Sequence, residues 1–139
     1  ETGFRESYRI IGETVITGQD YPPGRHFEDA VSYAFYPADL HTRTGVKPKP
    51  LKRGIVPTVP ISSLIPKDSR NIIVAGRCIS SDRLANSALR VQAACMGMGQ
   101  AAGATAALAV RNKTTPSSVP LEKIHGLLRE HNAIVPEKS

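Results

Sequence analysis

Residues 71–110 read NIIVAGRCISSDRLANSALRVQAACMGMGQAAGATAALAV, and this stretch decides the fold class. It opens on a β-branched run at residues 72–74, which stops at Ala75 and Gly76. A polar loop follows, and then a long segment of Ala, Gly, Met and Leu. A strand, a glycine turn, a polar loop and a small-faced helix in this order are typical of α/β domains that bring backbone amides against a cofactor.

The elements around this stretch follow from its hydrophobic pattern. Residues 71–75 are short and apolar, as a buried parallel strand is, and they predict a strand. The helix after it is predicted from about Ser87 to Arg111. A final helix is predicted to open at Ser117 and Ser118, with Pro120 in its first turn, and to end near His131 and Asn132. Its apolar face consists of Leu121, Ile124, Leu127 and Leu128.

The first half of the chain predicts β structure interrupted by proline and glycine. Residues 1–20 indicate a loop followed by a strand or bent strand, because β-branched residues dominate there. Val31, Tyr33 and Phe35 alternate with small residues, which predicts a half-buried strand. Residues 55–66 carry repeated prolines, which cannot donate to a ladder, so an edge strand or an extended path is expected.

Length, charge and composition argue against several classes of protein. The chain has 139 residues, enough for one domain with a core, and a net charge of +6. Its densest basic patch, residues 47–53, holds no aromatic side chain to stack on bases, so a solvated loop is expected rather than a nucleic-acid interface. Cys78 and Cys95 have neither CxxC spacing nor a His at zinc-ligand spacing, so no metal site is expected. The sequence leaves a disulfide between them open but favours two buried or half-buried thiols.

The long predicted helix has three competing interpretations. Gly97, Gly99 and Gly103 each cost roughly 1 kcal/mol relative to Ala, so they need an offsetting contact. Gly99 and Gly103 share a face on which a neighbouring backbone can pack; alternatively, the start of the helix faces a cofactor. A membrane span is disfavoured, because Arg90 and Gln100 are among the residues that make the segment too polar. No GxGxxG occurs in the chain, so no pyrophosphate loop is predicted within it.

Five landmarks occur in a fixed order along the chain. Residues 5–13, RESYRIIGE, resemble an RExRRIxGE pattern, with Tyr8 in place of one of its basic residues, and are followed by Asp20. Residues 37–41, PADLH, correspond to a DIH element, and residues 57–67, PTVPISSLIPK, to an IPYRxLIPK stretch. Residues 75–103 join AGRCIS to the pattern RVxxxCMxxGQAAG. Together these landmarks resemble a branch of the FAD-dependent oxidoreductases that is related in general plan to fumarate reductase flavoproteins.

The resemblance implies a mixed α/β fragment of a two-part protein. Residues 1–66 correspond to a β-rich segment on the substrate or cap side, and residues 67–112 to the C-terminal strand-turn-helix of a Rossmann-like FAD-binding domain. Residues 113–139 add a C-terminal helix. The family's N-terminal half, which binds the ADP portion of FAD through GxGxxG, is expected to be missing from this chain. The chain alone is therefore expected to be inactive and to bind FAD weakly.

The resemblance also assigns candidate cofactor-binding residues. It implies that Gly76 lets the backbone approach the cofactor and that the amides from Leu89 to Val91 face the O2/N1 edge of the flavin. That edge is negatively charged in reduced flavin, so the helix start and Arg90 would stabilise the reduced state. The candidate cofactor-binding residues are Gly76, Arg77, Cys78, Ser87, Leu89, Arg90 and Val91.

Candidate catalytic residues come from the first half of the chain. Arg5 and Arg9 suit the anchoring of an anionic or hydroxyl-rich substrate, whose identity the sequence leaves open. His41 can move a proton near neutral pH, as hydride transfer to flavin N5 requires of a neighbouring base. The other histidines match no motif and are expected on the surface: His26, His125 and His131.

A second function class stays open at this stage. The chain is either part of an FAD-dependent oxidoreductase, with the missing half and a small-molecule substrate as partners, or a non-enzymatic binding module that oligomerises through the Ala/Gly-rich helix. Self-association or element swapping is expected under either hypothesis, because apolar surface would be exposed. Nucleic acid and membrane are not expected as partners. The compartment is left open, with the cytoplasm slightly favoured.

Overall fold

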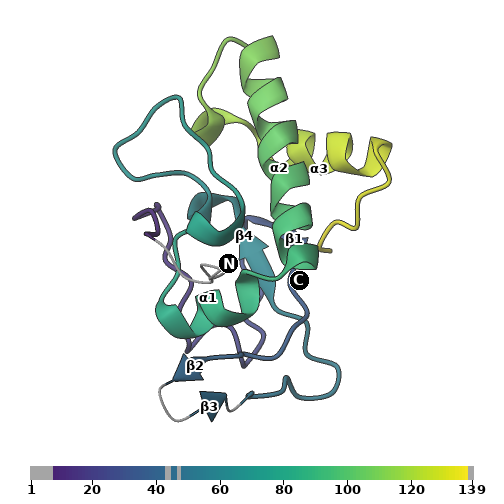
Figure 1. The fold of residues 1–139 in the computed structure, drawn as a ribbon. Helices are drawn as coiled ribbons and strands as arrows, with labels where there is room; N and C mark the ends of the chain where they lie inside the picture. Colours follow the sequence, from purple (N-terminus) through teal and green to yellow (C-terminus); the bar gives the residue numbers. More distant parts are fainter. Residues whose placement is uncertain (1–7, 43–44, 47, 138–139) are drawn as a thin grey trace.

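Helix α2 (Gln92–Arg111) is the longest element, and α3 (Leu121–Glu130) and strand β1 (Ala30–Tyr33) pack against it, whereas α1 (Arg83–Leu89) lies beyond its N-terminal end (Figure 1). The computed structural model describes residues 8–42, 45–46 and 48–137. Within these residues the protein is mixed α/β, because α1, α2 and α3 combine with short antiparallel strand pairs. The predicted fold class is confirmed.

The main strand pair packs against α2. Strand β1 runs antiparallel to β4 (Thr58–Pro60), with Tyr33 opposite Thr58. The predicted strand is confirmed but ends before Phe35, whose side chain is 72% exposed. The proline-bearing stretch after residue 55 contributes an edge strand, as its composition predicts, and continues into the 3-10 helix η1 (Ile61–Ser63).

A second, smaller strand pair lies apart from the first (Figure 1). It consists of β2 (His41–Thr42) and β3 (Gly45–Val46), with His41 opposite Val46. The strand predicted within residues 1–20 is absent from the described part, residues 8–20. Isolated bridges connect this stretch to the rest of the protein instead, including a parallel one between Ile16 and Ser81.

The prediction of a strand at residues 71–75 is wrong. The segment is extended, since Ala75 has φ −145° and ψ 162°, but it forms no part of a sheet among the described residues. A single backbone hydrogen bond, from the Val74 N–H to the Leu64 carbonyl (2.8 Å), attaches it to the protein. A strand requires a ladder of such bonds and a parallel one requires cover on both faces, whereas Ile72 is 55% exposed.

The predicted helix from Ser87 to Arg111 is divided in two. Asp82 starts α1 earlier than expected, because its Oδ1 accepts a hydrogen bond from the Ala85 N–H at 2.8 Å. The helix then ends, and Val91 takes an extended conformation (φ −75°, ψ 155°) before α2 begins. The prediction missed both the Asp82 cap and this break.

Helix α3 confirms the predicted final helix and packs beside α2 (Figure 1). Its buried residues include Ile124 and Leu128, which belong to the predicted apolar face. His26 and His131 are exposed, as predicted, but the prediction for His125 is wrong. His125 is buried, with its Nε2 2.7 Å from the Ala30 carbonyl, so a hydrogen bond to β1 satisfies the imidazole.

The glycines of α2 have different surroundings. A Cβ at Gly97 would lie 3.0 Å from the Ser32 Oγ, so the absence of a side chain there allows β1 to approach the helix. No described atom lies within 4 Å of the corresponding position at Gly99 or Gly103. Close packing therefore explains Gly97, and the packing interpretation of the other two glycines finds no support among the described residues.

Helix α2 is also long and apolar enough to cross a membrane, judged by length and composition alone. In the folded chain it buries one side against β1 and the turn before α3. The buried residues on that side are Ala94, Met98, Ala101, Ala102, Thr105 and Ala109. A helix with one buried face is typical of a protein core, and length and composition alone do not distinguish it from a membrane span. The expectation that the membrane is not a partner therefore stays a prediction.

Tyr21 ties the chain before β1 to the chain after it. Its side chain is 1% exposed, and its hydroxyl donates to the Tyr36 carbonyl at 2.9 Å and accepts from the Tyr36 N–H at 3.3 Å. Burial raises the pKa of Tyr21 to about 12, and the hydrogen bond to Tyr36 opposes this only in part. The neutral hydroxyl is therefore part of the folded structure.

We expect the free energy of unfolding to decrease as the pH rises from 10 to 12. Tyr21 has its ordinary pKa of 10.0 in the unfolded chain and a raised one in the folded chain, so its contribution is complete below pH 10 and is lost as the folded group ionises. Urea unfolding across this range checks it. Tyr21→Phe should flatten the decrease, whereas Tyr8→Phe, at a 96% exposed position, should not. Identical slopes in the two variants would contradict the assignment.

Candidate functional site

Asp39 brings two of the predicted site residues together. Its Oδ2 lies 3.4 Å from Nε2 of His41, at the start of β2, and 3.9 Å from Nη2 of Arg90, just after α1. Arg90 Nη2 also donates to the Asp39 backbone carbonyl at 3.2 Å. Reciprocal backbone hydrogen bonds between Ala38 and Lys49 hold this segment in place. A carboxylate, an imidazole and a guanidinium from distant parts of the sequence therefore share one site.

The polar atoms of this cluster are not all paired. The Arg90 side chain is only 10% exposed, and its Nε is buried without a hydrogen-bond partner among the described residues. Asp39 Oδ1 is also buried and also lacks a hydrogen-bond partner among the described residues. Buried polar atoms are normally satisfied by protein, water or ligand. Their position marks this cluster as a place where a polar ligand group or a water can bind.

Arg83 adds a second guanidinium to the cluster. It opens α1, and its Nη2 donates to the His41 backbone carbonyl at 3.3 Å. Sequence patterns alone predict no role for Arg83 or Asp39. A signal was present for Asp39, which stands two residues before the predicted His41 in the DIH-like element. For Arg83 the sequence offered only a place in a polar loop.

The start of α2 lies directly beside Arg90. Val91 is the N-cap of this helix and supplies no side-chain hydrogen bond, so the first-turn amides have no capping group among the described residues. Gln92 and Ala93, in that first turn, are exposed. An uncapped helix start next to an arginine favours a negatively charged or electron-rich group.

Two of the predicted cofactor-binding residues lie within α1. Ser87 is 1% exposed and its Oγ donates to the Leu84 carbonyl at 2.7 Å, while Leu89 is fully buried. The amides without helical partners are those at the start of α2, one to two residues beyond the predicted range from Leu89 to Val91. A role for Ser87 and Leu89 in cofactor binding stays a prediction.

The glycine turn forms the 3-10 helix η2 (Gly76–Cys78), which contacts both α1 and α2. Gly76 has φ +84°, a conformation that favours glycine. Asn86 Nδ2 donates to the Arg77 carbonyl at 3.2 Å and so attaches this turn to α1. Cys78 and Cys95 are half-buried free thiols, as predicted. Burial raises the pKa of the Cys95 thiol, and the charge of Arg77 opposes that shift.

The remaining predicted catalytic residues lie near η2 or outside the described part of the chain. The N–H of Ile10 donates to the Cys78 carbonyl at 2.9 Å, so the segment that carries Arg9 runs beside this turn. Arg9 is half-buried. Arg5 lies outside the described residues. Within the ranges that the structure describes, no group of three metal-ligating side chains occurs.

We expect Asp39→Asn to lower the free energy of unfolding by about 1–3 kcal/mol, because the nearly buried Arg90 guanidinium would lose its carboxylate. Urea unfolding measures the change. Asp68→Asn is the matched control: Asp68 is exposed and has φ +60°, which Asn tolerates, so its effect should stay within about 0.5 kcal/mol. Equal effects of the two substitutions would show that Asp39 does not stabilise Arg90.

Comparisons with known proteins show the family of the chain. No curated protein and no solved structure matches the chain. The model of one protein family, described as FAD dependent oxidoreductase, matches residues 1–128, which is most of the chain. That range includes the Asp39 cluster, the η2 turn and both α1 and α2. The chain therefore belongs to the FAD-dependent oxidoreductase family.

Proposed function

We propose that this chain forms the flavin-ring side and the substrate side of an FAD-dependent oxidoreductase that transfers a hydride between its substrate and the flavin. The observation that carries the proposal is Arg90, which is nine-tenths buried, has an unpartnered Nε and stands at the uncapped start of α2. FAD, when bound, would supply the hydride acceptor at its N5 atom. Every other step is assigned to residues of this chain.

The start of α2 and Arg90 would face the electron-rich edge of the flavin ring. A helix N-terminus carries roughly half a positive charge, and Arg90 adds a full one. Both favour the reduced, anionic form of the ring over the oxidised form. In this proposal Gly76 and the turn around Arg77 and Cys78 line the cofactor, because η2 packs against α1 and α2.

His41 is the proposed general base. Its Nε2 lies 3.4 Å from Asp39 Oδ2, and this contact holds the imidazole in one orientation. Its side chain is 39% exposed, so a substrate can reach it. Arg9, together with Arg5, would anchor the substrate, which on this basis is anionic or rich in hydroxyl groups.

The proposal assigns the ADP portion of FAD to another part of the parent protein. The chain contains no GxGxxG, and no other glycine-rich loop with that spacing. Residues 67–112 would complete a Rossmann-like domain from its C-terminal side, with residues 1–66 as the substrate side and residues 113–139 as a terminal helix. The chain alone would then lack catalytic activity and would hold FAD weakly.

A second candidate function is oligomerisation through α2. Met96 is 71% exposed and Val110 is 79% exposed, and Gly99 and Gly103 lie between them on the same face. Such an apolar face favours association, either with the rest of the enzyme or with another copy. Sedimentation equilibrium distinguishes this function: a stable dimer that is lost in Met96→Glu would support it.

The test of the main proposal is FAD retention. We expect the 139-residue chain, mixed with FAD and passed through a desalting column, to keep little visible flavin absorbance. A longer protein that joins this chain to a segment with the GxGxxG fingerprint should keep about one FAD per chain. Stoichiometric retention by the chain alone would contradict the assignment of the ADP portion to another part. Lack of retention by both proteins would contradict the flavin proposal itself.

A further inference from the structure

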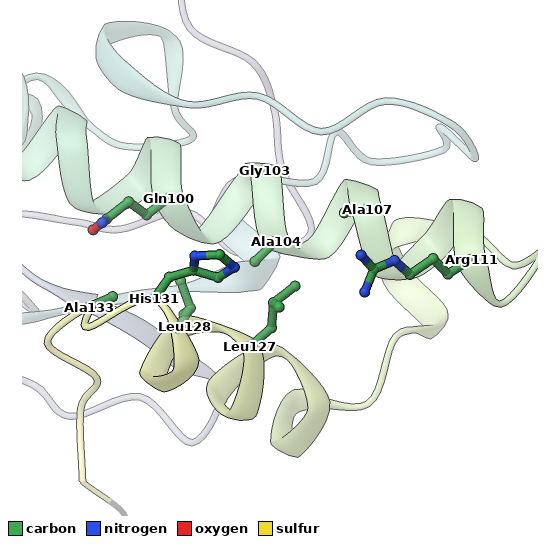
Figure 2. Close-up of a pocket in the computed structure, with 9 residues that line it drawn as sticks. All are labelled: Gln100, Gly103, Ala104, Ala107, Arg111, Leu127, Leu128, His131 and Ala133. Atoms are coloured by element: carbon green, nitrogen blue, oxygen red, sulfur yellow. The ribbon is translucent and has the colours of Figure 1, made fainter.

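A groove between α2 and α3 lies apart from the Asp39 cluster, towards the opposite end of α2 (Figure 2). Its volume is about 320 Å³, at the lower end of the range of roughly 300–1,000 Å³ that is usual for small-molecule sites. A small ligand therefore fits it better than a folded partner does. The lining residues are Gln100, Gly103, Ala104, Ala107, Arg111, Leu127, Leu128, His131 and Ala133.

The middle of the groove is apolar. Gly103, Ala104 and Ala107 present almost no side chain on the α2 side, and Leu127 and Leu128 form the facing wall on α3 (Figure 2). The two leucines differ in burial: Leu128 is buried in the core, whereas Leu127 is half-exposed towards the groove. The small residues leave a trough that an unbranched hydrocarbon chain can occupy.

Positive charge lies at one end of this apolar trough. The Arg111 side chain extends back over the groove towards Leu127 (Figure 2). Among the described residues, no hydrogen bond or ion pair involves its guanidinium, and none of the lining residues is acidic. The His131 imidazole stands at the opposite end (Figure 2). An apolar trough with an unpaired guanidinium at one end is complementary to an apolar ligand with one anionic end.

We propose that this groove binds an aliphatic monocarboxylate, with its hydrocarbon chain along Ala104 and Ala107 and its carboxylate on the Arg111 guanidinium. A second copy of this chain is a weaker candidate for the same groove. The chain carries a net charge of +6, so another copy brings like charge to Arg111. This site is independent of the flavin proposal, since none of its residues belongs to the Asp39 cluster.

Octanoate, titrated into the ¹⁵N-labelled chain, is the direct probe. We expect saturable amide shifts confined to residues 100–111 and 127–133, with weak affinity in the low-millimolar range because the ligand is small and the groove is open. 1-Octanol, which has the same chain length and no charge, should bind at least threefold more weakly. Shifts centred outside these residues, or equal affinity for the two ligands, would overturn the proposal.

Matched variants test the two parts of the site separately. Ala107→Glu places a negative charge in the groove and should weaken octanoate binding more than tenfold. Val110→Glu adds the same charge on the solvent face of α2, where Val110 is 79% exposed, and should change the affinity less than twofold. Circular dichroism confirms that both variants fold. Equal losses in the two would show that net charge, and not the groove, controls binding.

Arg111→Gln isolates the carboxylate contact. Octanoate should bind about threefold to fivefold more weakly to this variant, as for an exposed charge pair, while 1-octanol should bind with unchanged affinity. Unchanged octanoate affinity would overturn the role of Arg111. Light scattering on the same samples identifies the alternative occupant: dimerisation that Ala107→Glu abolishes and octanoate does not displace would assign the groove to a second copy.

Discussion

The break between α1 and α2 is the constraint on which the candidate site depends. The Arg90 N–H still closes α1 by donating to the Asn86 carbonyl at 3.0 Å, and Val91 then leaves the helical conformation. This change of direction exposes the first turn of α2 and directs the Arg90 guanidinium to Asp39. A continuous helix would use those amides internally and would leave Arg90 on a different side.

Asp39 links the junction of α1 and α2 to β2, and this contact forms the candidate site. It contacts Arg90 from the second half of the chain and His41 from the first, and Arg83 donates to the His41 backbone. The cluster thus couples β2 to the junction of α1 and α2. The proposed function assigns this junction to the flavin, because a helix start with an adjacent arginine suits the anionic edge of a reduced flavin.

Local patterns predicted the elements that are determined locally. The apolar face of α3 appears in the structure, because burial on one side follows directly from residue period. A strand forms at β1 as predicted, but the predicted alternation does not appear, because Ala30, Val31 and Ser32 are all buried while Phe35 is exposed. The prediction of a strand at residues 71–75 was wrong, because a strand requires a ladder of backbone hydrogen bonds to a neighbouring strand. In this segment, Val74 makes one backbone hydrogen bond, to Leu64. The predicted surface position of His125 was wrong for a similar reason. Its burial depends on a hydrogen bond to the Ala30 carbonyl, which lies far away in the sequence.

Only part of the membership of the candidate site was predicted, and its geometry was not. Motif resemblance selected His41 and Arg90, yet it gave no reason to place them at one carboxylate, because Asp39 joins them only through tertiary structure. The break between α1 and α2 was not predicted from the sequence for another reason. Ala88 and Leu89 are good helix formers, so propensity favours continuity, and the Asp82 cap decides where α1 begins.

The midpoint potential of FAD in the complete enzyme tests the central claim most directly. Removal of a cation beside the ring destabilises the anionic reduced form, so Arg90→Gln should lower the two-electron potential by about 20–40 mV, equivalent to roughly 1–2 kcal/mol. Arg111→Gln, which removes the same charge at the other end of α2, should leave it unchanged. An unaltered potential in Arg90→Gln would contradict the placement of Arg90 and the start of α2 at the flavin.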